Sequence, residues 1–151
     1  MKVTRLAGAL GAEVTNFDLK NILTREDTKV VQELLTEHSV LFFPNQHLSI
    51  DQHISLGKLF GNLEGHPNLK NPNEMTKRYP ELFELHASRG GIANEWHTDL
   101  TFRPFPAKMS ILKMVSFHTY TKTCGLMRAY YVIIILPYIH SNMCAGACVL
   151  L

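Results

Sequence analysis

Hydrophobic residues near the start of the chain follow first a strand-like and then a helix-like spacing. Between Leu10 and Leu19 the apolar positions alternate loosely with polar ones, which predicts a short strand entering a loop. From Arg25 to Glu37 they recur three and four positions apart, directly after Thr24, whose hydroxyl suits a helix N-cap. The pattern therefore predicts a strand followed by a helix.

A second strand and helix are expected over residues 40–61. The apolar run 40–43 is stopped by Pro44, as in a buried strand, because proline cannot continue a central ladder. Ser49 and Gln52 have the spacing of a capping box, which predicts a helix start. Gly61 follows the apolar face of this helix and can adopt the left-handed conformation that ends it.

The next part of the chain predicts a loop and then strands. Residues 61–80 are rich in Asn, Pro and Gly, which favour turns, so we expect a long surface loop there. Leu82–His86, Trp96–Phe102 and Ala107–Val115 have the composition of strands. Two helices followed by several strands predict an α+β, mainly β domain with a sandwich or roll as its core.

The composition changes along the chain. With 151 residues and 46% hydrophobic content, the chain has the size of one domain. Every Asp and Glu lies at or before Asp99, and residues 129–151 carry no acidic or basic side chain apart from His140. We therefore divide the chain into residues 1–115 and an atypical tail, 116–151, that replaces or truncates the expected carboxyl-terminal part. Within it, Tyr130–Leu136 has the composition of a makeshift strand and is too short to span a bilayer, which needs about 20 apolar residues.

Charge and terminal sequences limit the possible partners and location. The net charge is +2 without a basic cluster, which argues against nucleic acid as a partner. Residues 1–10 lack a signal-peptide pattern, so a cytoplasmic location is expected, where the three cysteines would be reduced thiols. The final four residues, Cys148–Leu151, match a C-a-a-X prenylation motif. No polybasic stretch precedes the motif, so we interpret it as a coincidence and do not expect membrane anchoring.

The most informative short motif is His97-Thr98-Asp99. In an extended segment, residues i and i+2 project from the same face, so both side chains can reach one ion. An imidazole and a carboxylate suit iron(II), and two histidines with one carboxylate form the facial triad of non-haem oxygenases. Alone, the motif is also compatible with a surface pair or a satisfied hydrogen bond.

Four segments in order give the motif a context. They are LGAEVTNFDL (residues 10–19), LLTEHSVLFFPNQHLSIDQHISLGKLFG (34–61), Gly65-His66-Pro67 and NEWHTDLTFRPFP (94–106). Together they resemble the taurine dioxygenase (TauD/TfdA-like) family of iron(II)- and 2-oxoglutarate-dependent dioxygenases. The resemblance covers roughly residues 8–115, and the Trp-His-Thr-Asp segment is its most specific part.

The resemblance implies a double-stranded β-helix, also called a jelly-roll or clavaminate synthase-like fold, here incomplete on its carboxyl-terminal side. It implies iron(II) bound by His97 and Asp99, 2-oxoglutarate as cosubstrate, and O₂-dependent oxidation of a small, anionic organic substrate of the taurine/sulfonate or aryloxy-acid type. His66 matches a substrate-binding position, although a plain loop histidine fits its neighbours equally well. In the tail, only Thr123 offers a match to the threonine that contacts 2-oxoglutarate.

The chain also departs from the family pattern. The distal metal histidine and the arginine that binds the far carboxylate of 2-oxoglutarate are not recognisable, and neither His118 nor His140 matches the distal motif. The alternative function is therefore an inactive remnant that acts at most as a weak metal-binding or interaction module. Strand edges left unpaired would favour a homo-oligomer. The substrate itself is not determined by the sequence.

Overall fold

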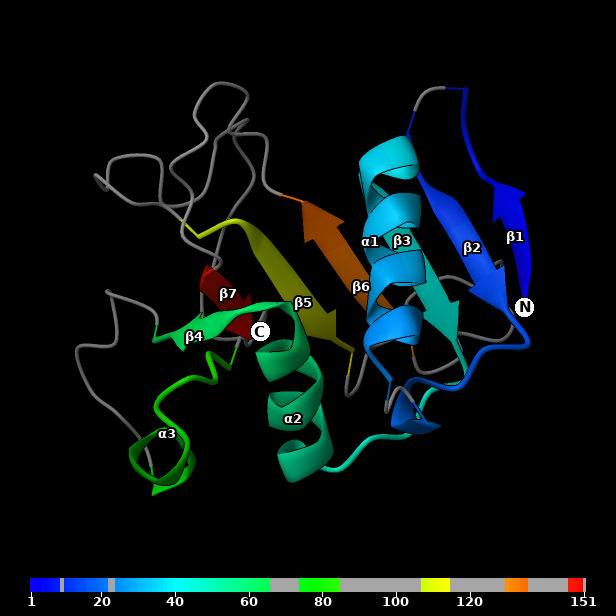
Figure 1. Cartoon of the computed structure of the whole chain (residues 1–151). Helices are drawn as coiled ribbons and strands as arrows, with labels where there is room; N and C mark the ends of the chain where they lie inside the picture. Colours follow the sequence, from blue (N-terminus) through cyan, green and yellow to red (C-terminus); the bar gives the residue numbers. More distant parts are fainter. Residues whose placement is uncertain are drawn as a thin grey trace, which may run out of the picture.

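The computed structural model describes residues 1–8, 10–21, 24–65, 74–84, 107–114, 130–135 and 147–150 (Figure 1). These residues form one mixed sheet in the order β1-β2-β3-β6-β5-β7-β4, with helices α1 and α2 in front of one face. The elements are β1 (Lys2–Arg5), β2 (Ala12–Thr15), η1 (Leu19–Asn21), α1 (Arg25–His38), β3 (Val40–Pro44), α2 (Ile50–Phe60), β4 (Asn62–Glu64), α3 (Glu74–Arg78), β5 (Met109–Lys113), β6 (Tyr130–Ile135) and β7 (Ala147–Leu150).

The two predicted helices are confirmed, together with their caps. Thr24 and Asp27 form a reciprocal capping box at the start of α1, and Ser49 and Gln52 form another at the start of α2. Gly61 ends α2 as expected, but with φ 151° and ψ −169°. Its backbone is therefore extended with positive φ rather than left-handed helical, which lets the chain run directly into β4.

The strand predictions for residues 40–43, 107–115 and 130–136 are confirmed by β3, β5 and β6. The predicted makeshift strand in the tail has a larger role than expected, because β6 lies between β3 and β5 and is antiparallel to both. β7, also in the tail, is parallel to its neighbours β5 and β4. The tail thus contributes two strands to the sheet.

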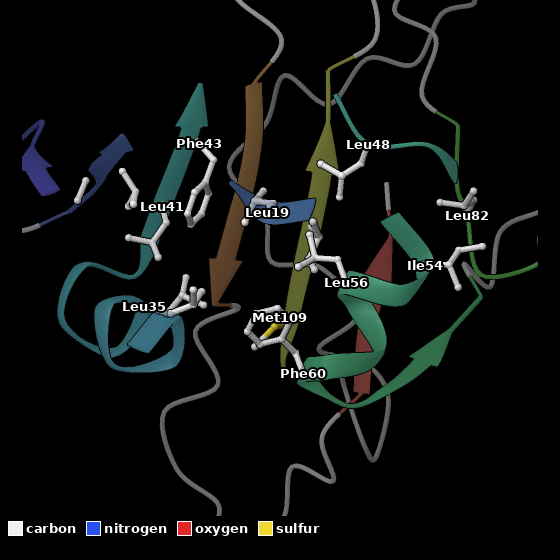
Figure 2. Packing of buried hydrophobic residues seen from close by; sticks show 14 residues of the cluster. Leu19, Leu35, Leu41, Phe43, Leu48, Ile54, Leu56, Phe60, Leu82 and Met109 are labelled. Carbon is white, nitrogen blue, oxygen red and sulfur yellow. The ribbon is translucent and has the colours of Figure 1, made fainter. Parts of the chain in front are cut away.

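The core lies between the sheet and the two helices (Figure 2). Alternate residues of β2, β3 and β5 face the helices and are at most 1% exposed, because successive side chains of a strand point to opposite faces. α1 contributes Val31 and Leu35 to the same cluster, and α2 contributes Leu56 and Phe60. The buried strand residues are Ala12, Val14, Leu41, Phe43, Met109 and Ile111.

Two predictions for the middle of the chain are wrong in the part that the structure describes. The expected loop over residues 61–80 contains strand β4 and helix α3. Leu82–Glu84, expected to begin a strand, adds none to the sheet, and Leu82 instead packs in the core with 6% exposure. The predicted strand Trp96–Phe102 lies outside the described residues.

The predicted fold class is met at the coarse level of a mainly β arrangement with helices. The described residues form one seven-stranded sheet covered by helices, so they do not include the second sheet of a double-stranded β-helix. Among these residues, no helix has the length and apolar character needed to cross a membrane.

Candidate functional site

The predicted site residues His66, His97, Asp99 and Thr123 all lie outside the described residues. Within the described ranges, no group of three or more His, Cys, Asp or Glu side chains is placed to hold a metal ion. The structural information on the site therefore comes from the elements that flank these residues.

The segment that carries His66, His97 and Asp99 leaves and re-enters the sheet at neighbouring points. It leaves after Glu64 at the end of β4 and returns at Met109 at the start of β5. β7 pairs with both strands, and Val149 pairs with Glu64 on one side and with Ser110 on the other. Two strand spacings separate these anchors, so the ends of the segment are about 10 Å apart. The fold therefore anchors both ends of this segment, called the excursion below, near each other: the chain leaves β4 at its carboxyl end and enters the parallel strand β5 at its amino end.

Gly65, directly before His66, packs tightly against another part of the excursion. A Cβ atom added to Gly65 would lie 2.7 Å from the carbonyl oxygen of Pro80. Such a distance is far shorter than a normal contact, and a backbone oxygen cannot rotate away as a side chain can. A residue with a side chain would have to displace the chain at this point, so glycine permits the close approach that begins the excursion.

A buried histidine links α2 to β5. His53 is 2% exposed, and burial lowers its pKa from 6.5 to about 4, assisted by the positive charge of Lys113. A hydrogen bond with the backbone of Ile111 acts in the opposite direction. The imidazole is therefore neutral at pH 7, and it connects the helix to the strand that follows the excursion.

Lys113 makes a second link from β5 to the segment before α2. Its ammonium group donates a 2.6 Å hydrogen bond to the carbonyl oxygen of Leu48. Neither Lys113 nor His53 was predicted from the sequence as a functional residue. The available signal for His53 was its position on the apolar stripe of α2, three residues before Leu56 and seven before Phe60.

A polar hollow of about 570 Å³ lies between the loops that follow β2 and β3. Its wall includes Gln46, whose amide accepts from Leu19 N–H and donates to the carbonyl oxygens of Phe17 and Pro44. Asp18, also in the wall, accepts hydrogen bonds from Lys20 N–H and from the Asn21 side chain. Gln46 thus holds the two loops together, and Asp18 stabilises the turn within its own loop, so both side chains already have partners in the protein.

The hollow lies away from the point where the excursion enters β5. The register through β6 places Phe43, near the end of β3, level with Lys113, at the end of β5. The excursion enters β5 at its other end, at Met109, about 13 Å away at the usual rise per strand residue. We therefore do not assign the hollow to the predicted site at His97 and Asp99.

The family of the chain is shown by its sequence. The family described as "Taurine catabolism dioxygenase TauD, TfdA family" matches residues 2–119, which include both the Gly-His-Pro and the Trp-His-Thr-Asp segments. The chain belongs to this family.

Curated relatives carry related names. The chain is 33% identical over 114 residues to an alkylsulfatase of Acinetobacter baylyi, covering 75% of this chain and 35% of the relative. It is 35% identical over 116 residues to an alpha-ketoglutarate-dependent sulfate ester dioxygenase of Pseudomonas putida, covering 76% and 37%. It is 31% identical over 137 residues to an alpha-ketoglutarate-dependent 2,4-dichlorophenoxyacetate dioxygenase of Cupriavidus pinatubonensis, covering 79% and 48%. The match thus spans between a third and a half of these relatives.

Solved structures support the same fold. A taurine dioxygenase from Burkholderia xenovorans superposes with a TM-score of 0.57 at 24% identity, covering 77% of this chain and 41% of that one. The protein AAD-2, in complex with Mn(II) and N-oxalylglycine, gives a TM-score of 0.52 at 24% identity, covering 75% and 37%. The described sheet and helices are therefore part of the fold of these dioxygenases.

Proposed function

We propose that the protein is an iron(II)- and 2-oxoglutarate-dependent dioxygenase that oxidises a small, anionic organic substrate. The observation that carries the proposal is the family match over residues 2–119, which includes the Trp-His-Thr-Asp segment. The names of the relatives, which include a sulfate ester dioxygenase and a dichlorophenoxyacetate dioxygenase, support an anionic sulfate-ester or aryloxy-acid substrate. The complete form of the proposed fold is a double-stranded β-helix.

His97 and Asp99 are proposed as iron ligands. One imidazole nitrogen and one carboxylate oxygen, two residues apart, form a donor pair that suits iron(II). When bound, iron(II) would supply O₂ activation with 2-oxoglutarate as cosubstrate: one oxygen atom would end in succinate as carbon dioxide leaves, and the other would oxidise the substrate. We propose that His66, next to the tightly packed Gly65, contacts the substrate anion and that Thr123 contacts 2-oxoglutarate. We also propose that residues 1–115 are the amino-terminal part of a dioxygenase domain and that residues 116–151 are an atypical tail.

Anaerobic titration of the purified chain with iron(II) and 2-oxoglutarate tests the proposal. We expect the weak visible charge-transfer band of a 2-oxo acid chelated to iron(II). His97→Ala and Asp99→Ala should each abolish the band, because each removes a ligand. His47→Ala is the matched control, since His47 is an exposed histidine of the hollow, and this variant should keep the band.

Turnover is measured separately, as succinate formed in the presence of alkyl sulfates or aryloxyacetates. Substrate-dependent succinate that disappears in both ligand variants supports the enzyme. A folded chain with neither the band nor turnover contradicts the proposed activity and favours the inactive remnant. A band without turnover on any of these anions would contradict the proposed activity on them and favour a chain that only binds the metal.

A further inference from the structure

The outer edge of β1 is the most conspicuous surface that the proposed activity does not use. β1 is the terminal strand of the described sheet and pairs only with β2 among the described strands (Figure 1). An edge strand presents unpaired N–H and C=O groups on its outer side, which can pair with a strand of another chain.

The ladder with β2 determines which residues present these groups. Leu6, immediately after β1, donates its N–H to the carbonyl oxygen of Gly11. In an antiparallel ladder, bonded and non-bonded pairs alternate, so Lys2 and Thr4 also direct their backbone groups toward β2. Val3 and Arg5 therefore direct their N–H and C=O groups outward.

Exposed apolar side chains gather at the same edge. Four large hydrophobic residues of the described chain are strongly exposed, and Met1 at 56%, Leu6 at 56% and Leu10 at 59% flank β1. Only Leu59, at 40%, lies elsewhere, on α2. Apolar side chains beside open backbone groups are typical of a surface that another chain covers.

We propose that β1 pairs with β1 of a second copy of this chain, antiparallel and about a two-fold axis at Thr4. Val3 then lies opposite Arg5 of the second copy, and both exchange their outward N–H and C=O groups. Thr4 lies opposite its own equivalent as a non-bonded pair. A two-fold arrangement closes the dimer and leaves no further β1 edge open.

Charge disfavours one of the two neighbouring registers. Lys2 and Arg5 protect the edge against pairings that place like charges opposite each other. Moving the axis to Arg5 would place two arginines opposite each other, whereas an axis at Thr4 places each cation opposite an uncharged residue. Arg5 is also held by Glu37 of its own chain, which reduces repulsion between the two copies.

The same register covers part of the exposed apolar surface. Leu6 lies opposite Lys2 of the second copy, on the face of the sheet away from α1. The aliphatic stem of the lysine can pack on the leucine while its ammonium group stays in water. The contact rests on a strand of four residues, so we expect a dimer in exchange with monomer rather than a permanent one.

Sedimentation of the purified chain over a range of concentrations, with two variants of Val3, tests the hydrogen-bonded edge. Val3→Pro removes an outward N–H without breaking a bond to β2, and should weaken dimerisation at least about tenfold. Val3→Ala is the matched control, because it also removes apolar contacts but keeps the N–H, and it should stay within about threefold of the unmodified chain. A chain that is monomeric at all concentrations, or equal effects of both variants, would overturn the proposal.

Crosslinking tests the register. In a background with Cys124, Cys144 and Cys148 replaced by serine, Thr4→Cys should form a disulfide with its equivalent, because non-bonded antiparallel pairs bring the Cα atoms to about 4.5 Å. Lys2→Cys should not, since its counterpart lies four residues away along the pair. A dimer that crosslinks through Lys2→Cys but not through Thr4→Cys, or assemblies that keep growing with concentration, would show another contact and overturn the proposal.

Discussion

The ammonium group of Lys113 donates a 2.6 Å hydrogen bond to the carbonyl oxygen of Leu48, a residue 65 positions earlier in the chain. The same lysine lowers the pKa of His53 through its charge. One side chain of β5 therefore both anchors the start of α2 and influences the protonation of a histidine within that helix.

Replacing Lys113 by methionine tests both effects. Lys113→Met removes the bond to a partly buried carbonyl, and we expect the free energy of unfolding to fall by about 1–2 kcal/mol. The pKa of His53 should rise, but not to its ordinary value, because burial is the larger cause of its shift. Chemical denaturation and NMR titration measure the two changes. Lys58→Met, which changes an exposed lysine of α2, should alter neither quantity.

His53 should make the stability of the protein depend on pH. Its pKa is lowered from 6.5 to about 4 in the folded state, so the unfolded chain takes up a proton at a higher pH than the folded one. The stabilisation is complete above pH 6.5 and is lost as the pH falls toward 4, by on the order of 3 kcal/mol in total.

Denaturation series at several pH values with two histidine variants isolate this contribution. His53→Gln, whose side chain does not titrate, should remove the part of the decline between pH 6.5 and pH 4 that His53 causes. His47→Gln changes an exposed histidine and should retain it. An unchanged pH profile in His53→Gln would contradict the assignment.

The contact between Gly65 and Pro80 predicts an unusual sensitivity to one methyl group. Gly65→Ala places a Cβ 2.7 Å from a backbone oxygen, so we expect a loss of about 1–3 kcal/mol in unfolding free energy. Gly8→Ala is the natural control, because nothing lies within 4 Å of its added Cβ, and its stability should be unchanged or slightly higher. Thermal unfolding of both variants gives the comparison, and equal effects would argue against the close approach.

Gln46 should be intolerant of both apolar and charged replacements, for different reasons. Gln46→Met removes one acceptor and two donor interactions of a buried amide, and we expect a loss of about 2–3 kcal/mol. Gln46→Glu keeps an acceptor for Leu19 N–H but directs a carboxylate at two carbonyl oxygens, so it should destabilise more at pH 7 and recover partly in acid. Urea denaturation at pH 7 and pH 5 distinguishes the two. A glutamate variant as stable as the methionine variant at pH 7 would contradict this role of Gln46.

Local features of the fold followed directly from the sequence. The caps at Thr24 and Ser49 depend on side chains three positions away, and both helices begin where these residues predict. The pairing of strands depends on distant parts of the chain, as between Val40 and Ile134, and no local pattern encodes it. β4 was missed for this reason, because the three residues Asn62–Glu64 form a strand only by pairing with β7.

The candidate site, too, could be predicted from the sequence only in part. The His97–Asp99 pair could be predicted because its chemistry depends on a spacing of two residues, and it stays a prediction because it lies outside the described residues. The role of His53 could not be predicted, since its neutrality at pH 7 arises from burial under β5 and from Lys113. The two ends of the excursion are anchored because β4 and β5 both pair with β7. β7 begins more than thirty residues after the end of β5, so no local pattern could predict this anchoring.

The position of β6 has a consequence for the newly made protein. A ribosome synthesises β3 and β5 before β6, the strand that separates them in the finished sheet. Ribosomes add about 5–20 residues per second, so several seconds pass between the synthesis of β3 and the synthesis of β6. During that interval the apolar face and open ladder of β3 are available to chaperones or to other nascent chains, so slower translation would increase the demand for chaperone assistance.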